Sequence, residues 1–506
     1  MARRSIVKAV ATVTVFSVIT RCLSFIFKIY LSRTVGAEII GLYQISLSVF
    51  FLFSALSSSG LPTVLSRKIA EDRAVGEDRA ARFFTGALII VAFISVFTAV
   101  VLGFTAPYLK GLFSDDRALP LFRIMLPALI STGIYSVIRG WFWGNKRFTE
   151  YSVTETLEEV LRILFTLLFI SGAVSGIQGA YGIALAFTVS DVAVALILIV
   201  LFFIRGGRLK KKPLLKEIAL PALPLTAMRV FGSFVGTVVA LILPARLIAS
   251  GMFVAEATAS IGRIAGMANP LLFAPNAIIS SLIIVLIPEM SENGITGNNF
   301  ALNQNINKGI SFSLIISGLF LFLLFALGEP LTELLYNDTA SGKYLSAAAY
   351  LMLLMPINQM TASTLNSIGM EKESFLTFAI GTALLIFSIY FLPKYLGIYA
   401  VVVANLASLL TSVIGNLSLL HRRIKLDFKF LKTFFAVAVF TVPCAYLAKT
   451  MYSLCGSTYY ALPVAAIVSA VMYVALCLVF GLIKLSYFSF GKKKSKQKKT
   501  NKTATV

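Results

Sequence analysis

The sequence is poor in the residues that most enzyme active sites and metal centres use. It has one histidine and four cysteines in 506 residues, and no two cysteines have the CxxC spacing. It also lacks a GxxxxGK(S/T) phosphate-binding loop, an HExxH zinc motif and a GxSxG nucleophile motif. These absences argue against ATP hydrolysis, zinc chemistry and serine hydrolysis on this chain. We therefore expect no enzyme activity, no cofactor and no metal site.

Charge is scarce as well, because only 13% of the residues are charged whereas 58% are hydrophobic, and the mean hydropathy is +0.88. A soluble protein of this length has too little polar surface to cover such a composition. Apolar runs long enough to cross a bilayer recur along the whole chain. The runs are continuous rather than alternating, which indicates helices and not a β-barrel. The predicted fold class is an all-α polytopic membrane protein with about 14 transmembrane helices.

The boundaries of these spans follow from the apolar runs, with errors of a few residues. The segment 246–267 is the weakest assignment, and we interpret it as an outer loop with a partial helix. The expected spans are 7–32, 39–64, 84–108, 119–143, 152–174, 179–204, 218–245, 267–288, 308–328, 344–367, 374–392, 397–420, 430–449 and 460–483.

The net charge of +23 is compatible with nucleic-acid binding, but the placement of the basic residues points elsewhere. They gather in alternate short loops between apolar runs and in the tail 492–502. This is the distribution that the positive-inside rule gives to cytoplasmic segments. We therefore predict a multi-pass protein of the cell membrane with both termini in the cytoplasm, and no nucleic-acid partner.

Three pairs of motifs recur in order and suggest an internal repeat. Their offset is about 220 residues, as expected for two similar halves that each hold an even number of spans. The pairs are Gly60-Leu61-Pro62 with Leu286-Ile287-Pro288, Trp143-Gly144-Asn145-Lys146 with Ile368-Gly369-Met370-Glu371-Lys372, and Gly179-Ala180-Tyr181 with Gly397-Ile398-Tyr399.

The repeat predicts a domain division with pseudo-two-fold symmetry along the membrane normal. Residues 1–204 form an N-terminal six-helix lobe, and residues 218–421 form a C-terminal six-helix lobe. A basic cytoplasmic linker, 205–217, joins them. Helices 13 and 14 occupy 422–484, and a basic cytoplasmic tail occupies 485–506.

Several cations fall inside the predicted spans, where a charged side chain costs roughly 2.5–3.5 kcal/mol. Arg21 and Lys28 lie two helical turns apart on one face of the first span, and no acidic residue of that span neutralises them. Arginine suits phosphate through two parallel hydrogen bonds and lysine suits it as a point charge. Such a pattern favours an anionic ligand such as a lipid diphosphate. The candidate substrate-binding residues are Arg21, Lys28, Arg33, Arg229, Arg246 and Arg263.

For some charged residues a structural role and a functional role are both open. Arg33, Arg139 and Arg246 either extend to lipid headgroups or belong to the site. Glu158 and Arg162 are four residues apart and form a pair along one helix. Asp191 either accepts a hydrogen bond from a hydroxyl such as Thr188 or serves the site. The candidate coupling or structural group is Glu155, Glu158, Glu159, Arg162 and Asp191.

The first 165 residues contain six specific motifs, which are Thr20-Arg21-Cys22-Leu23-Ser24-Phe25, Ser32-Arg33-Thr34-Val35-Gly36-Ala37-Glu38, Gly60-Leu61-Pro62, Ser66-Arg67-Lys68, Arg139-Gly140 and Leu157-Glu158 with Arg162-Ile163. Together these motifs resemble the stage V sporulation protein B family. That family belongs to the polysaccharide and oligosaccharidyl-lipid flippase superfamily and is related to the lipid II flippase MurJ.

This resemblance implies 12 or 14 helices in two lobes around a central cationic cavity, with Arg21 lining the cavity and Lys28 at a second basic position. It also implies export of a lipid-linked sugar precursor, for peptidoglycan and in spore cortex formation. Where the family often has glutamine, this chain has Glu155 and Glu159, so these acids either offset the cavity charge or couple transport to protons.

The function that we expect is a flippase that moves a lipid II-like cell-wall precursor by alternating access. Two alternatives remain, an exporter of another lipid-linked polysaccharide repeat unit and a cation-coupled multidrug antiporter. An outer acidic pair, Asp115-Asp116, would suit a glycosyltransferase, but solvated loops commonly carry such pairs. We expect a monomer whose partners are a lipid-linked oligosaccharide diphosphate and membrane lipid, with cell-wall synthesis enzymes as candidate protein partners.

Overall fold

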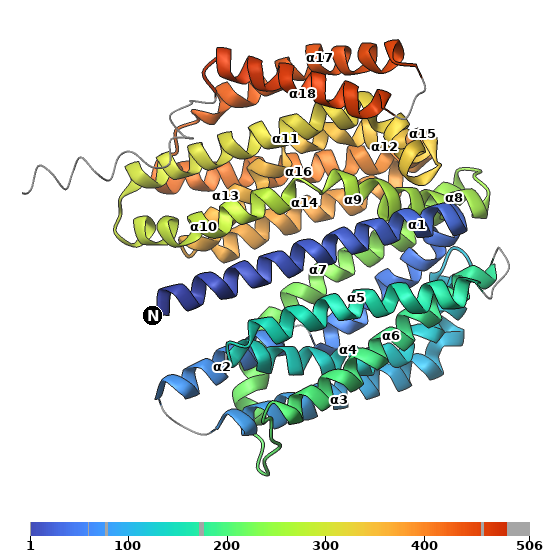
Figure 1. Cartoon of the computed structure of the whole chain (residues 1–506), viewed down its shortest axis with the longest axis vertical. Helices are drawn as coiled ribbons and strands as arrows, with labels where there is room; N and C mark the ends of the chain where they lie inside the picture. Colours follow the sequence, from blue (N-terminus) through green and yellow to red (C-terminus); the bar gives the residue numbers. More distant parts are fainter. Residues whose placement is uncertain (1, 59, 76–78, 172–176, 457–459, 483–506) are drawn as a thin grey trace, which may run out of the picture. The chain divides into compact units, whose positions relative to one another are not determined.

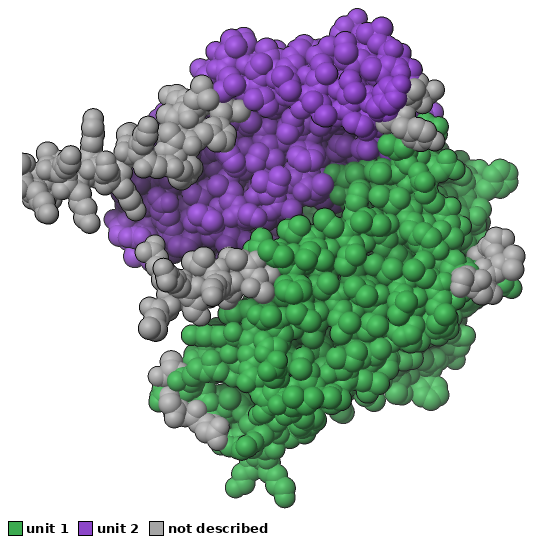
Figure 2. Space-filling model, in the orientation of Figure 1, with its two compact units in different colours: residues 1–271, 332–341, 382–404 green, residues 272–331, 342–381, 405–506 purple. Residues whose placement is uncertain are grey.

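A computed structural model describes residues 2–58, 60–75, 79–171, 177–456 and 460–482, and every regular element in this part of the chain is a helix (Figure 1). The chain divides into two compact units (Figure 2). Unit 1 comprises residues 1–271, 332–341 and 382–404, and unit 2 comprises residues 272–331, 342–381 and 405–506. The predicted tail 485–506 lies outside the described residues.

Unit 1 is built from the helices of the first half of the chain, with two short additions from the second half. Helices α3 to α6 lie side by side in Figure 1, and α1 packs against α4, α5, α7 and α8. The helices are α1 (Ala2–Ser58), α2 (Leu61–Val75), α3 (Ala80–Thr105), η1 (Ala106–Leu112), α4 (Ala118–Gly144), α5 (Phe148–Ser171), α6 (Ile177–Ile204), α7 (Leu215–Ala249), α8 (Val254–Ile261), η2 (Gly262–Ala268) and α9 (Asn269–Leu272), and the additions contain α15 (Pro393–Leu396) and η4 (Gly397–Tyr399).

Most of the remaining helices belong to unit 2. Four of them, α11, α12, α14 and α16, have one end in unit 1. They are α10 (Asn276–Ile295), α11 (Asn299–Tyr336), α12 (Thr339–Ala348), η3 (Ala349–Leu353), α13 (Met355–Ser367), α14 (Glu371–Phe391), α16 (Ala400–Ile424), α17 (Phe430–Leu454) and α18 (Ala461–Val479).

The predicted all-α membrane architecture is confirmed. Each predicted span overlaps one or more of these helices, and 11 of the described helices are long and apolar enough to cross a bilayer. The first two spans form one helix, α1, which is broken at Gly36 by a φ of 79° and a ψ of 173°. Glycine adopts a positive φ without strain, so it allows the backbone to break here. The break lies between the predicted spans 7–32 and 39–64. We call the end of unit 1 around this residue the Gly36 end.

The segment 246–267 is more regular than a loop. It contains α8 and then η2, a short π-helix. Gly262 at the start of η2 packs against α1, where a Cβ would overlap the carbonyl oxygen of Ala37. Gly41 makes the reciprocal contact, because a Cβ there would overlap the carbonyl oxygen of Thr258. Glycines on both elements therefore allow the two backbones to touch.

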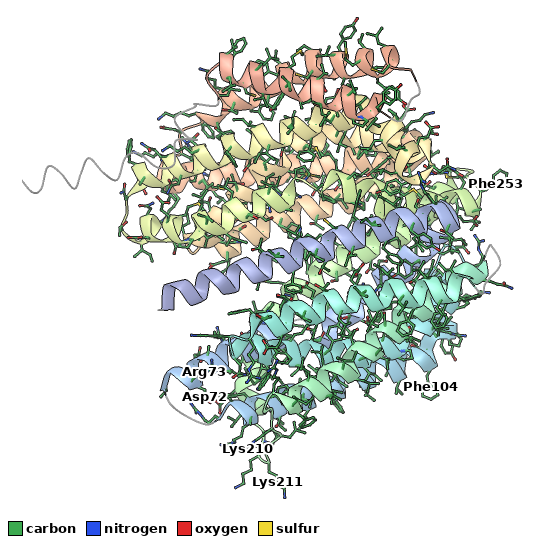
Figure 3. The ribbon with its side chains drawn as sticks, in the orientation of Figure 1. Asp72, Arg73, Phe104, Lys210, Lys211 and Phe253 are labelled. Atoms are coloured by element: carbon green, nitrogen blue, oxygen red, sulfur yellow. The ribbon has the colours of Figure 1, made fainter. Side chains whose placement is uncertain are left out.

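The surface of unit 1 fits a protein that lies in a bilayer. Phe104 and Phe253 are 80% and 85% exposed, and both project outward in Figure 3. Lys210 and Lys211 project from the tip of the loop between α6 and α7, which is the predicted basic linker (Figure 3). Exposed apolar side chains along the spans and basic side chains at a loop tip match the hydrocarbon and headgroup layers.

Helices α17 and α18 are held to α11 within unit 2. The Tyr473 hydroxyl donates a hydrogen bond to the Ile315 carbonyl at 3.0 Å, and it occupies the space that a side chain at Gly318 would fill. The loop before α17 is clamped by two asparagines of α11. Asn303 accepts from the Asp427 amide at 2.8 Å, and Asn307 accepts from the Phe430 amide at 2.9 Å. These side chains satisfy backbone groups that would otherwise lack partners.

The α1–η2 contact gives a test of packing. Replacing Gly262 by alanine should destabilise the protein by about 1–3 kcal/mol, because the added methyl group forces two backbones apart. The control is Gly232→Ala in α7, where a Cβ meets no atom within 4 Å and alanine is the better helix former. Thermal unfolding in detergent should show a lower Tm for the first variant only. Equal Tm values would contradict the close packing.

Candidate functional site

The two predicted cations of the first span lie on the part of α1 before the Gly36 break. Arg21 is exposed and Lys28 is partly exposed. Neither forms an ion pair or a hydrogen bond with another residue that the structure describes. The neighbouring Thr20 hydroxyl lies 2.8 Å from the hydroxyl of Thr156, which fixes this part of α1 against α5. Two side chains that keep their hydrogen-bonding capacity on a membrane helix are available to an anion.

A buried network of ion pairs joins α4, α5 and α6. Glu158 accepts hydrogen bonds from Arg139 and from Arg162, each at 2.6 Å. Arg162 also lies 3.3 Å from Glu159 and 3.4 Å from Asp191. The Asp191 side chain is only 1% exposed. The predicted pair of Glu158 and Arg162 is therefore present, as part of a larger network.

Two partners in this network differ from those that the sequence suggests. Asp191 accepts its hydroxyl hydrogen bond from Thr132 of α4 at 2.8 Å. Thr188 instead donates to the carbonyls of Ile124 and Ala184. Arg139 does not extend to the headgroups, because its side chain is 15% exposed and is paired with Glu158. Its guanidinium also lies 4.5 Å from the centroid of the Tyr135 ring, a cation–π distance.

The charges of the network do not balance. Its two arginines face three carboxylates, those of Glu158, Glu159 and Asp191. With all five groups ionised the network carries one net negative charge, which is costly in a buried place.

A fourth acid, Glu155, stands one helical turn before Glu159 on α5. It is partly exposed and forms no ion pair with a described residue. It lies within electrostatic range of Arg21 and Arg139, and Lys28 lies within range of Glu159. The cations of α1 have no acid in their own span, but the fold brings the acids of α5 beside them.

The other candidate cations have protein partners. Arg229 donates to the Thr63 hydroxyl at 3.5 Å. Arg246 donates to the Tyr390 carbonyl at 2.8 Å. Arg33 donates to the carbonyls of Leu334 and Leu335. Arg263 forms ion pairs with Glu256 and Asp338. The six candidates thus do not form one group, because only Arg21 and Lys28 lie together without such partners among the described residues.

The outer acidic pair has separate partners and a structural environment. Asp116 pairs with Lys110 at 3.0 Å, whereas Asp115 is 3% exposed and pairs with Arg117 at 2.7 Å. Burial of Asp115 opposes ionisation, but hydrogen bonds from Arg117 outweigh burial and lower the pKa of this carboxyl below its ordinary value. Arg117 also pairs with Glu38 of α1 at 2.6 Å, and the Thr258 hydroxyl of α8 donates to Asp115 at 3.1 Å. Sequence reasoning missed this cluster, since its members lie far apart in the chain.

Comparison with known proteins gives a consistent set of relatives. A family model described as polysaccharide biosynthesis protein matches residues 6–293, and a second model of the same description matches residues 301–435. Stage V sporulation protein B of Bacillus subtilis (strain 168) is 24% identical, with 96% of this chain and 97% of the relative covered. The lipid II flippase MurJ of the same organism is 24% identical over 30% of each chain.

Two solved structures share the fold. A lipid II flippase MurJ in an inward closed conformation has a TM-score of 0.69 at 15% identity, with 93% of this chain and 99% of that chain covered. An inward-facing multidrug resistance MATE family transporter has a TM-score of 0.67 at 17% identity, with 82% of this chain and 98% of that chain covered. At these identities the likeness concerns the fold alone.

The buried network gives a test that compares two glutamates on one helix. Glu158→Gln should lower the free energy of unfolding by about 3–5 kcal/mol, because it leaves Arg139 buried without a carboxylate. The control Glu155→Gln removes an acid without an ion pair on the same helix and should change stability little. Thermal unfolding in detergent at neutral pH measures both. A Glu158 variant as stable as the control would show that this carboxylate does not hold α4 to α5.

Proposed function

Because the chain belongs to the polysaccharide biosynthesis protein family, we propose that it is a flippase for a lipid-linked cell-wall precursor of the lipid II type. The observation that carries this proposal is the pair Arg21 and Lys28. They are two cations on one face of a membrane helix, and neither has an ion-pair partner among the described residues. Such a face attracts a diphosphate and repels a cationic drug. Flipping a lipid headgroup breaks no covalent bond, so we propose a transporter and not an enzyme.

The orientation that we propose follows from the loop charges. The basic loop that carries Lys210 and Lys211 faces the cytoplasm, and both chain termini lie on that side. The Gly36 end then faces outward, at the far end of the part of α1 that precedes Gly36. In this orientation Arg21 lies part of the way along its span, where a headgroup that enters from the cytoplasm can reach it.

The proposed cycle uses the two predicted six-helix lobes, 1–204 and 218–421, as rocking bodies. Arg21 binds the diphosphate through its planar guanidinium, and Lys28 and Arg229 add positive charge. The lipid tail stays in the bilayer while the headgroup passes between the lobes. When the lobes rock, the headgroup is exposed on the outer side. The emptied cationic site then returns toward the cytoplasm, which a negative-inside membrane potential favours.

The acids of α5 and α6 divide into two proposed roles. Glu158 and Arg162 act mainly in structure, because both are largely buried and directly paired. Glu159 and Asp191 are candidates for proton coupling, since two arginines cannot neutralise three carboxylates. Glu155 partly offsets the positive charge of Arg21 and Lys28, so that a bound diphosphate can still leave.

Three further features belong to the same proposal. The likeness to a sporulation protein supports a role in spore cortex formation. The protein would act as a monomer, with membrane lipid around its spans and cell-wall synthesis enzymes as its partners. Arg21 and Lys28 would also bind the diphosphate of another lipid-linked polysaccharide repeat unit, so a transport experiment decides between the two substrates.

The test is transbilayer movement of lipid II in proteoliposomes that contain the purified full-length protein. Arg21→Ala should slow movement about tenfold or more, because hydrogen bonds to a charged group are worth roughly 1.5–3 kcal/mol. Arg21→Lys should retain part of the rate, since it keeps the charge and loses the planar fork. Arg422→Ala, which removes an exposed arginine at the end of α16, is the charge-matched control and should leave the rate unchanged.

The outcomes separate the hypotheses. Loss of lipid II movement in a folded Arg21→Ala variant, with normal movement in the Arg422→Ala control, would support a flippase that binds its substrate through Arg21. A well-folded parent that moves another lipid-linked repeat unit but not lipid II would replace the proposed substrate. A parent that moves neither and instead confers resistance to cationic dyes would overturn the flippase in favour of a multidrug antiporter.

A further inference from the structure

Three arginines at the Gly36 end hold backbone or acidic groups of two turns in the second half of the chain. The first turn joins α11 to α12, and Arg33 and Arg263 both contact it. The Arg33 guanidinium donates to the carbonyls of Leu334 and Leu335 in the last turn of α11, with Nε 2.9 Å from the Leu335 oxygen. These carbonyls have no partner within their own helix and carry its partial negative charge. Arg33 therefore caps α11 from outside.

Arg263 contacts the same turn two residues further on. Its Nε donates to Asp338 at 3.0 Å, and its Nη1 donates to Glu256 at 2.6 Å. The second oxygen of Asp338 accepts from the Ser341 amide at 2.6 Å, so this aspartate is also the N-cap of α12. The Arg263 and Asp338 side chains are only 18% and 15% exposed. Of the contacts at this turn, their ion pair is the best shielded from water.

The second turn is the last turn of α14, and Arg246 of α7 contacts it. Its Nε donates to the Tyr390 carbonyl at 2.8 Å, and its guanidinium stacks 4.3 Å from the centroid of the Tyr390 ring. Both turns belong to unit 1, within residues 332–341 and 382–404. The helices that lead into them, α11 and α14, begin in unit 2. The arginines therefore act on the ends of helices that begin in the other unit.

Gly36 places a break in α1 beside the first of these contacts. Arg33 lies three residues before it, and Glu38, which pairs with Arg117 at 2.6 Å, lies two residues after it. A Cβ at Gly36 would meet no atom within 4 Å, so the backbone conformation and not the available space requires glycine here. The two sides of the break are thus tied to different parts of unit 1.

We propose that Arg33, Arg246 and Arg263 form an outer latch, which holds the ends of α11 and α14 in unit 1 and must open before the headgroup leaves. This inference rests on the proposed function and its orientation. It removes these three arginines from the substrate-binding set and makes them positioning residues. The latch consists of a few local contacts, of which the exposed Arg33 contact is weak and the shielded Arg263–Asp338 pair is the strongest, so it opens without unfolding the protein. Each contact biases the equilibrium between closed and open outer ends.

A native cysteine reports this equilibrium. Cys22 is exposed on α1 next to Arg21, whereas Cys444 and Cys477 are buried. Replacing the partly exposed Cys455 by serine leaves Cys22 as the accessible thiol among these four. We infer that Cys22, one residue from Arg21, borders the path of the headgroup, so a membrane-impermeant maleimide added outside right-side-out vesicles labels it only when the outer side is open. The readout needs no substrate.

The variants separate the latch from a general loss of structure. Asp338→Asn keeps an N-cap side chain for α12 and removes the charge that faces Arg263. Arg33→Gln, Arg246→Gln, Arg263→Gln and Asp338→Asn should each speed labelling of Cys22 by roughly two- to fivefold. Arg263→Lys should stay near the parent, since it keeps the charge. Lys343→Gln, an exposed lysine of α12, is the control and should have no effect.

Each result bears on the latch. Faster labelling in the four variants, with Tm values near the parent, would support it, even if the parent does not move lipid II and the proposed substrate fails. Unchanged labelling in all four variants would overturn it. Slower lipid II movement in Arg33→Gln and Arg263→Gln with unchanged labelling would also overturn it, and would return these arginines to the substrate site.

Discussion

The structure depends on one constraint, which is that a charged side chain inside a bilayer must find a partner in the protein, in the ligand or at the headgroups. The chain meets this constraint in three different ways. In the core of unit 1, Glu158 binds Arg139 and Arg162, and Arg162 also pairs with Asp191, so the network joins three helices. At the Gly36 end, arginines bind carbonyls and acids of distant turns. On α1, Arg21 and Lys28 keep no such partner among the described residues.

These three solutions assign different tasks to residues of one chemical type. An arginine that is buried and doubly paired fixes helix packing. An arginine that holds the end of another helix controls where that end lies. An arginine that remains available can bind an anion. Burial and partners, rather than residue type, therefore separate the structural, conformational and binding roles, and this explains why a set of six cations chosen by residue type divides once contacts are known.

The sequence predicted the features that local pattern determines. The turn between the first two spans, the helical spans and the pairing of Glu158 with Arg162 follow from hydropathy and i, i+4 spacing. Contacts between helices could not be predicted from the sequence. Arg139 reaches Glu158 across 19 residues, and Arg33 reaches Leu335 across 302 residues. No local periodicity encodes such pairs, because they depend on which helix faces meet. The six-helix lobes remain a prediction from the repeat, which grouping residues by contact does not test.

The arrangement of charges around α1 also bears on how the protein is made. Arg21 and Lys28 are synthesised more than 120 residues before the acids of α5 that come to lie beside them. Each cation costs roughly 2.5–3.5 kcal/mol at the centre of an isolated helix. Before α5 has been made, α1 is therefore a poor membrane anchor. Its stable insertion depends on later helices, so the features that suit it to bind an anion make it rely on delayed assembly at the translocation machinery.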